Sequence, residues 1–364
     1  MNEETDKDLK LKVWEEFCNS LKESGSIILN EKDIDELDVV EGWRYLTRLT
    51  RLGLEMALEN NNPYFPSFYS LSHETAKIGA DNPDNIYLNA SIDGNCDYRI
   101  WGTRGTVHYL SFGTKSNKYD QDGTMVTTGE LDSKDIKIEN DGSFQILLSK
   151  NKKTGNWLSL KENTNMVIVR QTFLDRTQEE ASNLNIECLS SPTSPEALNL
   201  KFVTQSLQRV SAFVEGTAST FVKWTNIFKQ EPNSLPLQDQ SMYQSAGGDP
   251  NIYYLHGYWH LEENEALVIK TDVPDCEYWN FQLDNYWMES LDYRYHRISL
   301  NNKSAVLDKN KKLRIIISAT NPNMNNWIET AGHNHGTMLL RWVNASSYPE
   351  PTTEIQRVED LKND

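Results

Sequence analysis

The sequence has few cysteines, little positive charge and no long apolar run. Its cysteines lie far apart, without CxxC or another zinc-ligand spacing, which favours free thiols in a reducing compartment (Cys18, Cys96, Cys188, Cys276). A formal net charge of −17 leaves no basic surface for the phosphate backbone of a nucleic acid. No stretch approaches the roughly 18 apolar residues of a membrane span. We therefore expect neither nucleic acids nor membranes as partners.

Several targeting and catalytic signatures are also missing. The first residues, MNEETDKDLKLK, contain no apolar segment of the kind found in secretory signals, so we expect a cytoplasmic protein. No GxSxG motif marks a serine nucleophile, and no GxGxxG motif marks a phosphate-binding loop. The chemistry of the chain must therefore be argued from individual residues.

An internal repeat organises the chain. The segments Gly142–Phe173 and Lys311–Val343 each contain an apolar run, an Asn-Trp pair and a second apolar run that ends at an arginine. Upstream, Asn85-Ile86-Tyr87 recurs as Asn251-Ile252-Tyr253 at an offset of 166, and the offset grows to 171 at the arginines. A slow drift with constant order indicates a duplicated unit with small loop insertions. The features found in both copies are interpreted as structural (Trp157 and Trp327, Arg170 and Arg341).

The pattern of turns and aromatic residues indicates β-structure. Between Ile86 and Phe173, short apolar runs are separated by Asp-Gly pairs, which are hairpin signals because type I′ turns need positive φ. Ten Trp and sixteen Tyr suit a β-rich chain. We predict a mainly β fold with helical additions, built from two tandem jelly-roll-like β-sandwich units, a helical N-terminal segment and a helical connector.

Helices are expected before and between these units. Apolar spacing predicts helices around residues 9–21 and over Val40–Glu59, a short helix over Thr177–Leu184, and a long helix from Ser194-Pro195 to about Lys229. Two prolines near residue 350 argue against regular structure in the polar tail. The predicted domains are a helical N-terminal segment (1–80), a first β unit (81–175), a helical connector and loop (176–246), a second β unit (247–345) and a polar tail (346–364).

Four motifs together resemble a known family. They are Glu41-Gly-Trp-Arg-Tyr-Leu, Asp81-Asn-Pro-Asp-Asn-Ile-Tyr, Tyr98-Arg-Ile-Trp-Gly-Thr-Arg-Gly-Thr and Asn326-Trp-Ile-Glu-Thr-Ala-Gly-His333. In this order they resemble proteins that carry the domain of unknown function 1214 (DUF1214), which is often paired with the related domain 1254. The resemblance implies a pair of jelly-roll-like units, often in oligomers, and brings no settled activity. Exported members carry a signal peptide, which this sequence does not show.

The histidines concentrate in the second unit and suggest one candidate site. Two pairs have spacings that keep both members on one face of a strand, so they are candidate ligands for a borderline metal (His256, His260, His333, His335). Cupin jelly rolls use a similar His-x-His but follow it with a nearby glutamate, whereas Gly336-Thr-Met-Leu-Leu follows here. We predict no cofactor and favour histidines that hydrogen-bond to backbone, with a divalent metal as the alternative.

The loop Trp327–Gly336 is the second candidate. It keeps the duplicated Asn-Trp frame but adds a carboxylate, two imidazoles and two glycines, so Glu329 and His333 are the acid–base candidates. Aromatic platforms with carboxylates suit sugar recognition, which gives five candidate binding residues (Trp327, His335, Asp284, Tyr286, Trp287). The alternative is that the aromatic residues form the core, and that Glu329 and His333 only tie the loop to the sheet.

Two functions follow from these candidates. The first is a hydrolase-like or lyase-like enzyme that acts on a carbohydrate or small polar metabolite through the second unit. The second is a non-catalytic binding or assembly protein built from two β-sandwich units, with a glycan or another small molecule as ligand. A cupin-like metal enzyme is a third and weaker alternative. Sandwich units have edge strands that must be paired or covered, so we also expect a homo-oligomer.

Overall fold

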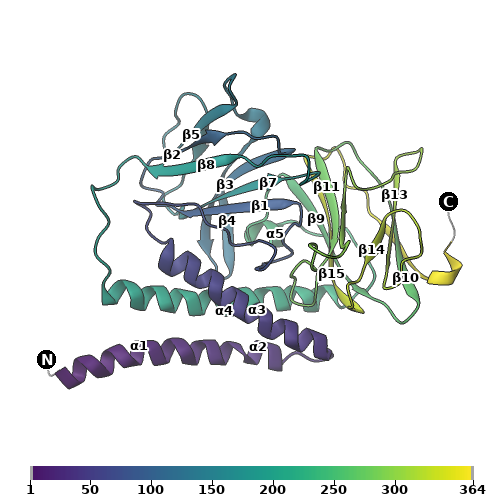
Figure 1. The fold of residues 1–364 in the computed structure, drawn as a ribbon, viewed down its shortest axis with the longest axis horizontal. Coiled ribbons are helices and arrows are strands. Elements are labelled where there is room, and N and C mark those ends of the chain that lie inside the picture. Colours follow the sequence, from purple (N-terminus) through teal and green to yellow (C-terminus); the bar gives the residue numbers. More distant parts are fainter. Residues whose placement is uncertain (1–2, 362–364) are drawn as a thin grey trace.

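The fold places two β units side by side on a layer of helices (Figure 1). It is known from a computed structural model that describes residues 3–361, with side chains from residue 11 onward. The first unit contains β1 (Asn85–Ser91), β2 (Tyr98–Thr103), β3 (Tyr109–Lys118), β4 (Thr124–Asp132), β5 (Ser143–Ser149), β6 (Trp157–Ser159), β7 (Met166–Thr172) and β8 (Asn183–Cys188). The second contains β9 (Ile252–His260), β10 (Glu265–Asp272), β11 (Tyr278–Leu283), β12 (Ser299–Asn301), β13 (Lys312–Ser318), β14 (Trp327–Glu329), β15 (His335–Val343) and β16 (Thr352–Arg357).

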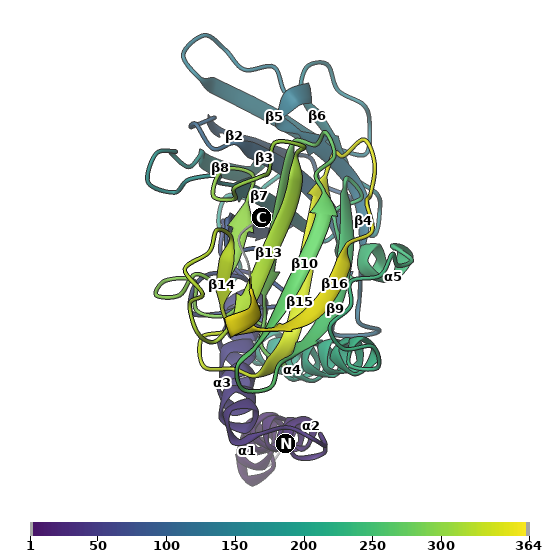
Figure 2. The same ribbon diagram turned by 90° about the vertical axis from the view of Figure 1, so that its right-hand side faces the viewer.

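Both units have the same topology. In the first, one sheet has the order β1-β7-β3-β4 and the other β6-β5-β2-β8. In the second, the corresponding orders are β9-β15-β11-β12 and β14-β13-β10-β16. Figure 2 faces the second unit and shows β14, β13, β10 and β16 side by side. The predicted fold class, with its duplication, is confirmed, because every strand of one copy has a counterpart in the other.

The duplicated Asn-Trp pair has the same structural task in each copy. Nδ2 of Asn156 donates to the carbonyls of Lys137 and Gln145, both at 2.9 Å, while Nδ2 of Asn326 donates to those of Val306 and Arg314 at 2.7 and 2.9 Å. The indole N–H that follows donates to a strand carbonyl at 3.1 Å in both copies. This pair therefore fixes the loop that leads into β6 or β14, as the duplication predicts.

One detail of the predicted repeat is wrong by a single residue. The sequence matched Tyr87 with Tyr253, but the strand registers match it with Tyr254. Arg170 lies opposite Tyr87, and Arg341 lies opposite Tyr254. Since successive side chains of a strand point to opposite faces, this shift decides which tyrosine faces the same side as the arginine.

Two further predictions are wrong for one reason. The segment predicted as a short helix over Thr177–Leu184 is a turn followed by β8, and the predicted polar tail contains β16. Each is the eighth strand of its unit and pairs with β2 or β10 at the edge of a sheet. Edge strands tolerate a proline just before their first residue, so Pro351 did not exclude a strand. Residues 1–2 and 362–364 of the terminal segments lie outside the described residues, and the domain boundaries stay predictions.

Helices α1 (Glu3–Ser24), α2 (Ser26–Leu29), α3 (Glu36–Leu54) and α4 (Leu200–Phe228) lie beneath the β units (Figure 1). The short α5 (Ser241–Ser245) lies beside β4, a π-helical turn (Glu55–Glu59) follows α3, and 3₁₀ turns occur at Ser133–Asp135 and Val358–Asp360. The capping box of Asp35 and Asp38 sets the start of α3 four residues before the predicted Val40. Asn199 caps α4, which therefore begins after the predicted Ser194-Pro195.

Three main groups of buried apolar residues stabilise the fold. Each β unit has its own core between its two sheets, and a third group joins α3 and α4 to both units. All four cysteines are free thiols. Within residues 3–361, no helix combines the length and the apolar character that a membrane span requires. The third group includes residues of both copies, among them Ile168 of the first and Leu339 of the second.

Candidate functional site

The predicted acid–base residues have different partners. Glu329 lies 2.9 Å from Nδ1 of His296, and both side chains are about one third exposed. His333 lies instead 3.0 Å from Oε2 of Glu41 on α3, where both side chains are only 9% exposed. The structure therefore does not bring Glu329 and His333 together as one acid–base pair, and their catalytic assignment stays a prediction.

Two of the five predicted binding residues, His335 and Trp287, hold helix α3. His335 Nε2 is 2.6 Å from Oδ2 of Asp38, and the Trp287 indole N–H donates to the Asp38 carbonyl at 2.8 Å. Trp287 also stacks on Tyr45, with ring centroids 6.5 Å apart. Tyr286 is fully buried next to Trp287. These contacts attach α3 to the second unit, which matches the structural alternative more closely than a sugar platform.

The metal candidates are separated as well. His256 is buried beside Phe228, whereas His260 is half-exposed near His335. One atom each of Asp35, Asp38 and His335 lies within 4.8 Å of the other two. The two carboxylates already accept the backbone N–H groups of their capping box, and Asp38 also contacts His335. Helix capping explains why these three side chains lie together, so the cluster is not evidence for a metal site.

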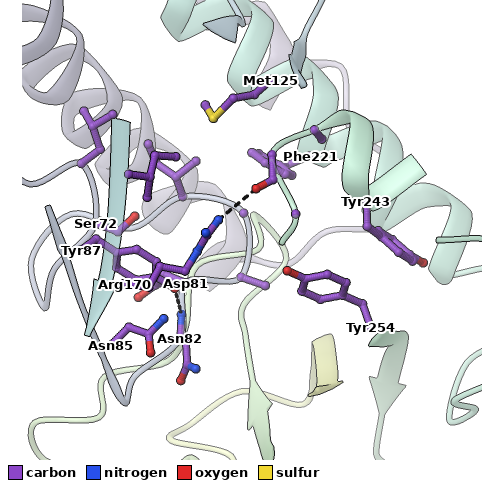
Figure 3. A pocket seen from close by; sticks show the side chains of 18 of the residues that line it. Ser72, Asp81, Asn82, Asn85, Tyr87, Met125, Arg170, Phe221, Tyr243 and Tyr254 are labelled. Carbon is purple, nitrogen blue, oxygen red and sulfur yellow. Dashed lines mark hydrogen bonds between the residues drawn. The ribbon is translucent and has the colours of Figure 1, made fainter. Parts of the chain in front are cut away.

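A cavity of about 170 Å³ lies where the two units meet α4. It is lined by residues of both units, of α4 and of the two loops that precede β1 and β9. Figure 3 shows Arg170 near its middle, with Tyr87 and Asn85 on one side and Tyr254 on the other. The remaining wall is largely aromatic or aliphatic, from Phe213, Phe221, Trp224, Tyr243, Ile168, Leu339 and Met125 among others.

The duplicated strands contribute matching pairs to this wall. Arg170 lies opposite Tyr87 on β1, and Arg341 lies opposite Tyr254 on β9. Two residues further along these strands, the first unit provides Asn89 and the second provides His256. All six side chains line the cavity, together with the counterparts Ile168 and Leu339. The cavity therefore forms only where the two copies meet, and neither copy could form it alone.

The charged lining is buried and mainly positive. Arg170 and Arg341 are 8% and 5% exposed. Burial alone lowers the pKa of Arg170, but the nearby carboxylate of Asp249 outweighs it and holds the pKa above its ordinary value. Burial also holds the pKa of His256 well below its ordinary value, and the charge of Arg341 lowers it further. At neutral pH the cavity wall therefore contains two guanidinium cations and a neutral imidazole, together with the side chain of Asp81, which accepts hydrogen bonds from Ser290.

Two polar atoms of the lining have no hydrogen-bond partner among the described residues. They are Nδ1 of His256 and Oδ1 of Asn85, which belong to residues 3% and 8% exposed. Buried polar atoms without a partner are rare and costly, and they call for an explanation. A bound molecule that hydrogen-bonds to both atoms would provide one.

A family model described as "Protein of unknown function (DUF1214)" matches residues 84–173 and 259–347. The two matches fall on the two β units. The chain belongs to the DUF1214 family. The resemblance inferred from the sequence motifs is therefore confirmed.

Solved structures provide further comparison for this DUF1214 chain. An uncharacterised protein from Burkholderia cenocepacia is 47% identical and has a TM-score of 0.95, over 97% of this chain and 99% of that one. A protein from Vibrio parahaemolyticus is 12% identical and has a TM-score of 0.49, over 86% of this chain and 98% of that one. A search of curated proteins gives no significant match. The function of this DUF1214 protein must therefore be inferred from its cavity.

Sequence reasoning missed this cavity although it noticed the arginines. Arg170 and Arg341 were interpreted as structural because both copies have them. The structure shows that each arginine points into a space shared by the copies. A signal was present in the sequence, since a buried charged residue retained in both halves marks the surface through which the halves meet. Recognising this signal requires the correct alignment of the two copies, in which Tyr87 matches Tyr254.

Proposed function

We propose that this DUF1214 protein binds a small organic molecule in the cavity between its two β units. The observation that carries the proposal is the cavity wall, in which a largely apolar lining surrounds two guanidiniums and two unpartnered polar atoms. Ligand sites in proteins commonly combine an apolar wall with a few placed polar groups. Packing alone does not require arginines at such a place, because a buried charge is costly.

The size of the cavity limits the ligand. A cavity of roughly 150 Å³ with an apolar lining is large enough to bind benzene, and this one measures about 170 Å³. A drug-sized molecule normally needs about 300 Å³ or more. The proposed ligand is therefore a molecule with a single ring or a short chain and one polar end.

Binding is a better match to this geometry than the hydrolase-like or lyase-like activity. That activity was assigned to Glu329 and His333, and neither residue lines the cavity between the units. Their present partners, His296 and Glu41, also differ. The second of the two functions inferred from the sequence, a non-catalytic binding protein, is therefore the one we propose.

Blocking the cavity tests the proposal. Ile168→Trp adds a bulky ring to the cavity wall, and Val126→Trp makes the same change at an exposed position of β4. Binding of benzyl alcohol, benzamide and benzoate is measured by calorimetry at millimolar concentration. We expect at least one probe to bind the unmodified protein and the Val126→Trp variant, and none to bind the Ile168→Trp variant.

Overpacking can itself destabilise a core by about 1–3 kcal/mol, so folding of each variant is checked by circular dichroism. Leu339→Trp, at the counterpart position in the second unit, provides an independent block if Ile168→Trp does not fold. Absence of binding of all three probes to the unmodified protein would contradict the proposed function. Equal binding to a folded blocked variant would contradict it too.

A further inference from the structure

The two arginines of the cavity make reciprocal contacts. Arg170 of the first unit donates from Nη2 to the carbonyl of Gly247, in the loop before the second unit, at 3.0 Å. Arg341 of the second unit donates from Nη2 to the carbonyl of Ala80, in the loop before the first unit. Each arginine therefore reaches across to the loop that leads into the other copy. We call these loops the leading loops, residues 79–84 and 246–251.

The leading loops are themselves equivalent, residue for residue. The Tyr87 hydroxyl accepts the backbone N–H of Asn82 at 2.9 Å, and the Tyr254 hydroxyl accepts that of Asp249 at 3.0 Å. Asn82 Oδ1 also accepts the N–H of Asp84 at 3.0 Å, as Asp249 Oδ1 accepts the N–H two residues later at the same distance. Asn82 and Asp249 thus occupy one position of one turn, in the two copies.

The two copies differ in charge at this position. Oδ2 of Asp249 lies 3.4 Å from Nη1 of Arg170, so the first arginine has a carboxylate partner. The reciprocal contact would place the Asn82 side chain beside Arg341, but an asparagine brings no charge. A change of one atom between the copies therefore removes the counter-ion of Arg341 and leaves that of Arg170 in place.

In the part of the chain that the structure describes, no carboxylate contacts Arg341 directly, although its charge acts on Asp84 and Asp284 nearby. Among the described residues, the hydrogen-bond acceptors of Arg341 are all neutral, namely Asn280 Oδ1, Gln282 Oε1 and the Ala80 carbonyl. The next carboxyl group, Asp284, accepts a hydrogen bond from Gln282. Burial raises the pKa of Asp284 to about 8, so this carboxyl is mostly protonated at neutral pH.

Two more carboxylates lie near, and each has its own partners. Asp81 accepts the backbone N–H and the hydroxyl of Ser290, both at 3.0 Å, and the buried ammonium of Lys77 donates to the Ser290 carbonyl next to it. Asp84 lies beyond Asn82 and accepts hydrogen bonds from Tyr278 and Asn301. Arg341 is therefore a buried cation without a carboxylate partner, at the wall of a cavity.

From these contacts we infer that the ligand of the cavity is a small organic carboxylate whose carboxylate group supplies the counter-charge of Arg341. This inference rests on the proposed function and names its ligand class. A guanidinium recognises a carboxylate through charge-assisted hydrogen bonds, which are strongest away from water. The apolar remainder of the ligand then lies against Leu339, Ile168 and Phe221.

Calorimetry with benzoate and its neutral analogue benzamide tests the ligand class. In the unmodified protein, benzoate should bind at least about tenfold more tightly, as expected for hydrogen bonds to a charged group. Asn82→Asp places a carboxylate beside Arg341, as Asp249 does beside Arg170. This variant should lose the preference for benzoate over benzamide, and its affinity for benzamide should stay within about threefold of that of the unmodified protein. Asn151→Asp, on an exposed turn, adds the same charge elsewhere and should change neither affinity.

The opposite change provides a second variant, in case Asn82→Asp does not fold. Asp249→Asn leaves Arg170 without its carboxylate as well, and we expect benzoate affinity to rise while benzamide affinity stays unchanged. Unchanged benzoate affinity in a folded Asn82→Asp or Asp249→Asn variant would overturn the inference. The comparison of the two probes in the unmodified protein tests it without any variant.

The outcomes separate this inference from the proposed function. Equal affinities for benzoate and benzamide in the unmodified protein would overturn the carboxylate assignment, while the cavity would remain a binding site. Failure of benzoate, benzamide and benzyl alcohol alike to bind the unmodified protein would contradict the proposed function itself. A final experiment measures whether sodium chloride displaces benzoate. Displacement of benzoate beyond the general effect of ionic strength, matched with sodium perchlorate, would identify a site for inorganic anions and overturn the assignment to an organic carboxylate.

Discussion

Replacing Glu41 with alanine should destabilise the protein by loosening helix α3 from the second unit. The Glu41 carboxylate lies 3.0 Å from His333 Nε2 and accepts the side-chain N–H of Asn285 at 2.9 Å. It also contacts Arg44 at 2.6 Å, but half of the Arg44 side chain is exposed. The alanine variant leaves Nε2 of the buried His333 without its partner, and it removes one of the two acceptors of the Asn285 amide, which keeps Glu289.

The magnitude follows from the burial of these groups. Removing one partner of a buried ion pair costs about 3–5 kcal/mol, because the remaining charge is left uncompensated. We discount the contact with Arg44, since exposed pairs contribute about 0–1 kcal/mol. With an unfolding entropy of about 2.1 cal/mol/K per residue, a loss of about 4 kcal/mol in this chain lowers the melting temperature by about 5 °C.

The effect should depend on pH in a defined direction. Burial alone lowers the pKa of His333, but the hydrogen bond and charge of Glu41 outweigh it and raise the pKa above 6.5. Burial alone raises the pKa of Glu41, but His333 outweighs it and lowers the pKa below 4.5. The His333 contribution is complete below pH 6.5 and is lost as the pH rises through its folded pKa. The Glu41 contribution is complete above pH 4.5 and is lost as the pH falls through its folded pKa.

The assay is thermal unfolding of the unmodified protein and the Glu41→Ala variant from pH 4 to pH 9. The difference in melting temperature should be largest between pH 4.5 and 6.5, the ordinary pKa values of the two groups, and narrow on either side. Glu354→Ala is the control, since Glu354 forms a half-exposed ion pair with Lys270 and should cost about 0–1 kcal/mol. Equal destabilisation by both variants, or a difference that widens steadily up to pH 9, would refute the reasoning.

Three further predictions follow from the fold. Gly79→Ala, measured by urea denaturation, should cost about 2–4 kcal/mol, because its φ is +60° and the new Cβ would lie 2.4 Å from the ring of Phe221. Gly142→Ala, with positive φ but no atom within 4 Å, should cost only about 1–2 kcal/mol; an equal cost would contradict the steric argument. Asn156→Ala and Asn326→Ala should each cost about 1–3 kcal/mol, since each removes equivalent hydrogen bonds, and unequal values would argue against equivalent loops. A homo-oligomer stays a prediction, and light scattering near the monomer mass of 41.9 kDa would contradict it.

The sequence predicted the fold where its pattern was local and repeated. Asn156-Trp157 and Asn326-Trp327 mark the same loop, because an asparagine side chain closes it and the indole fixes the strand that follows. The edge strand β16 was missed because it pairs on one side only and carries a single large apolar residue, Ile355. The edge strand β8 was missed although Leu184, Ile186 and Cys188 alternate with polar residues. The tripeptide Asn-Ile-Tyr also recurs one residue out of register, at residues 85–87 and 251–253, and this shifted the alignment from Tyr254 to Tyr253.

The candidate site was harder to predict because its contacts are distant in sequence. His333 and His335 find their partners in Glu41 and Asp38, almost three hundred residues earlier, and no local spacing encodes such a pairing. The cavity is lined by segments that lie far apart in the sequence, from Leu71 to Arg341. The difference between Asn82 and Asp249 is visible in the sequence, but its meaning appears only once the two turns are matched and Asp249 is seen to contact Arg170 of the other copy.

The most direct test of a ligand site between the units is a crystal structure of the protein soaked with 4-bromobenzoate, using the anomalous signal of bromine. The prediction is a bromine peak inside the cavity, with the carboxylate group against the guanidinium of Arg341. Bromine peaks confined to the outer surface of the protein, at a concentration that saturates any binding seen by calorimetry, would contradict it.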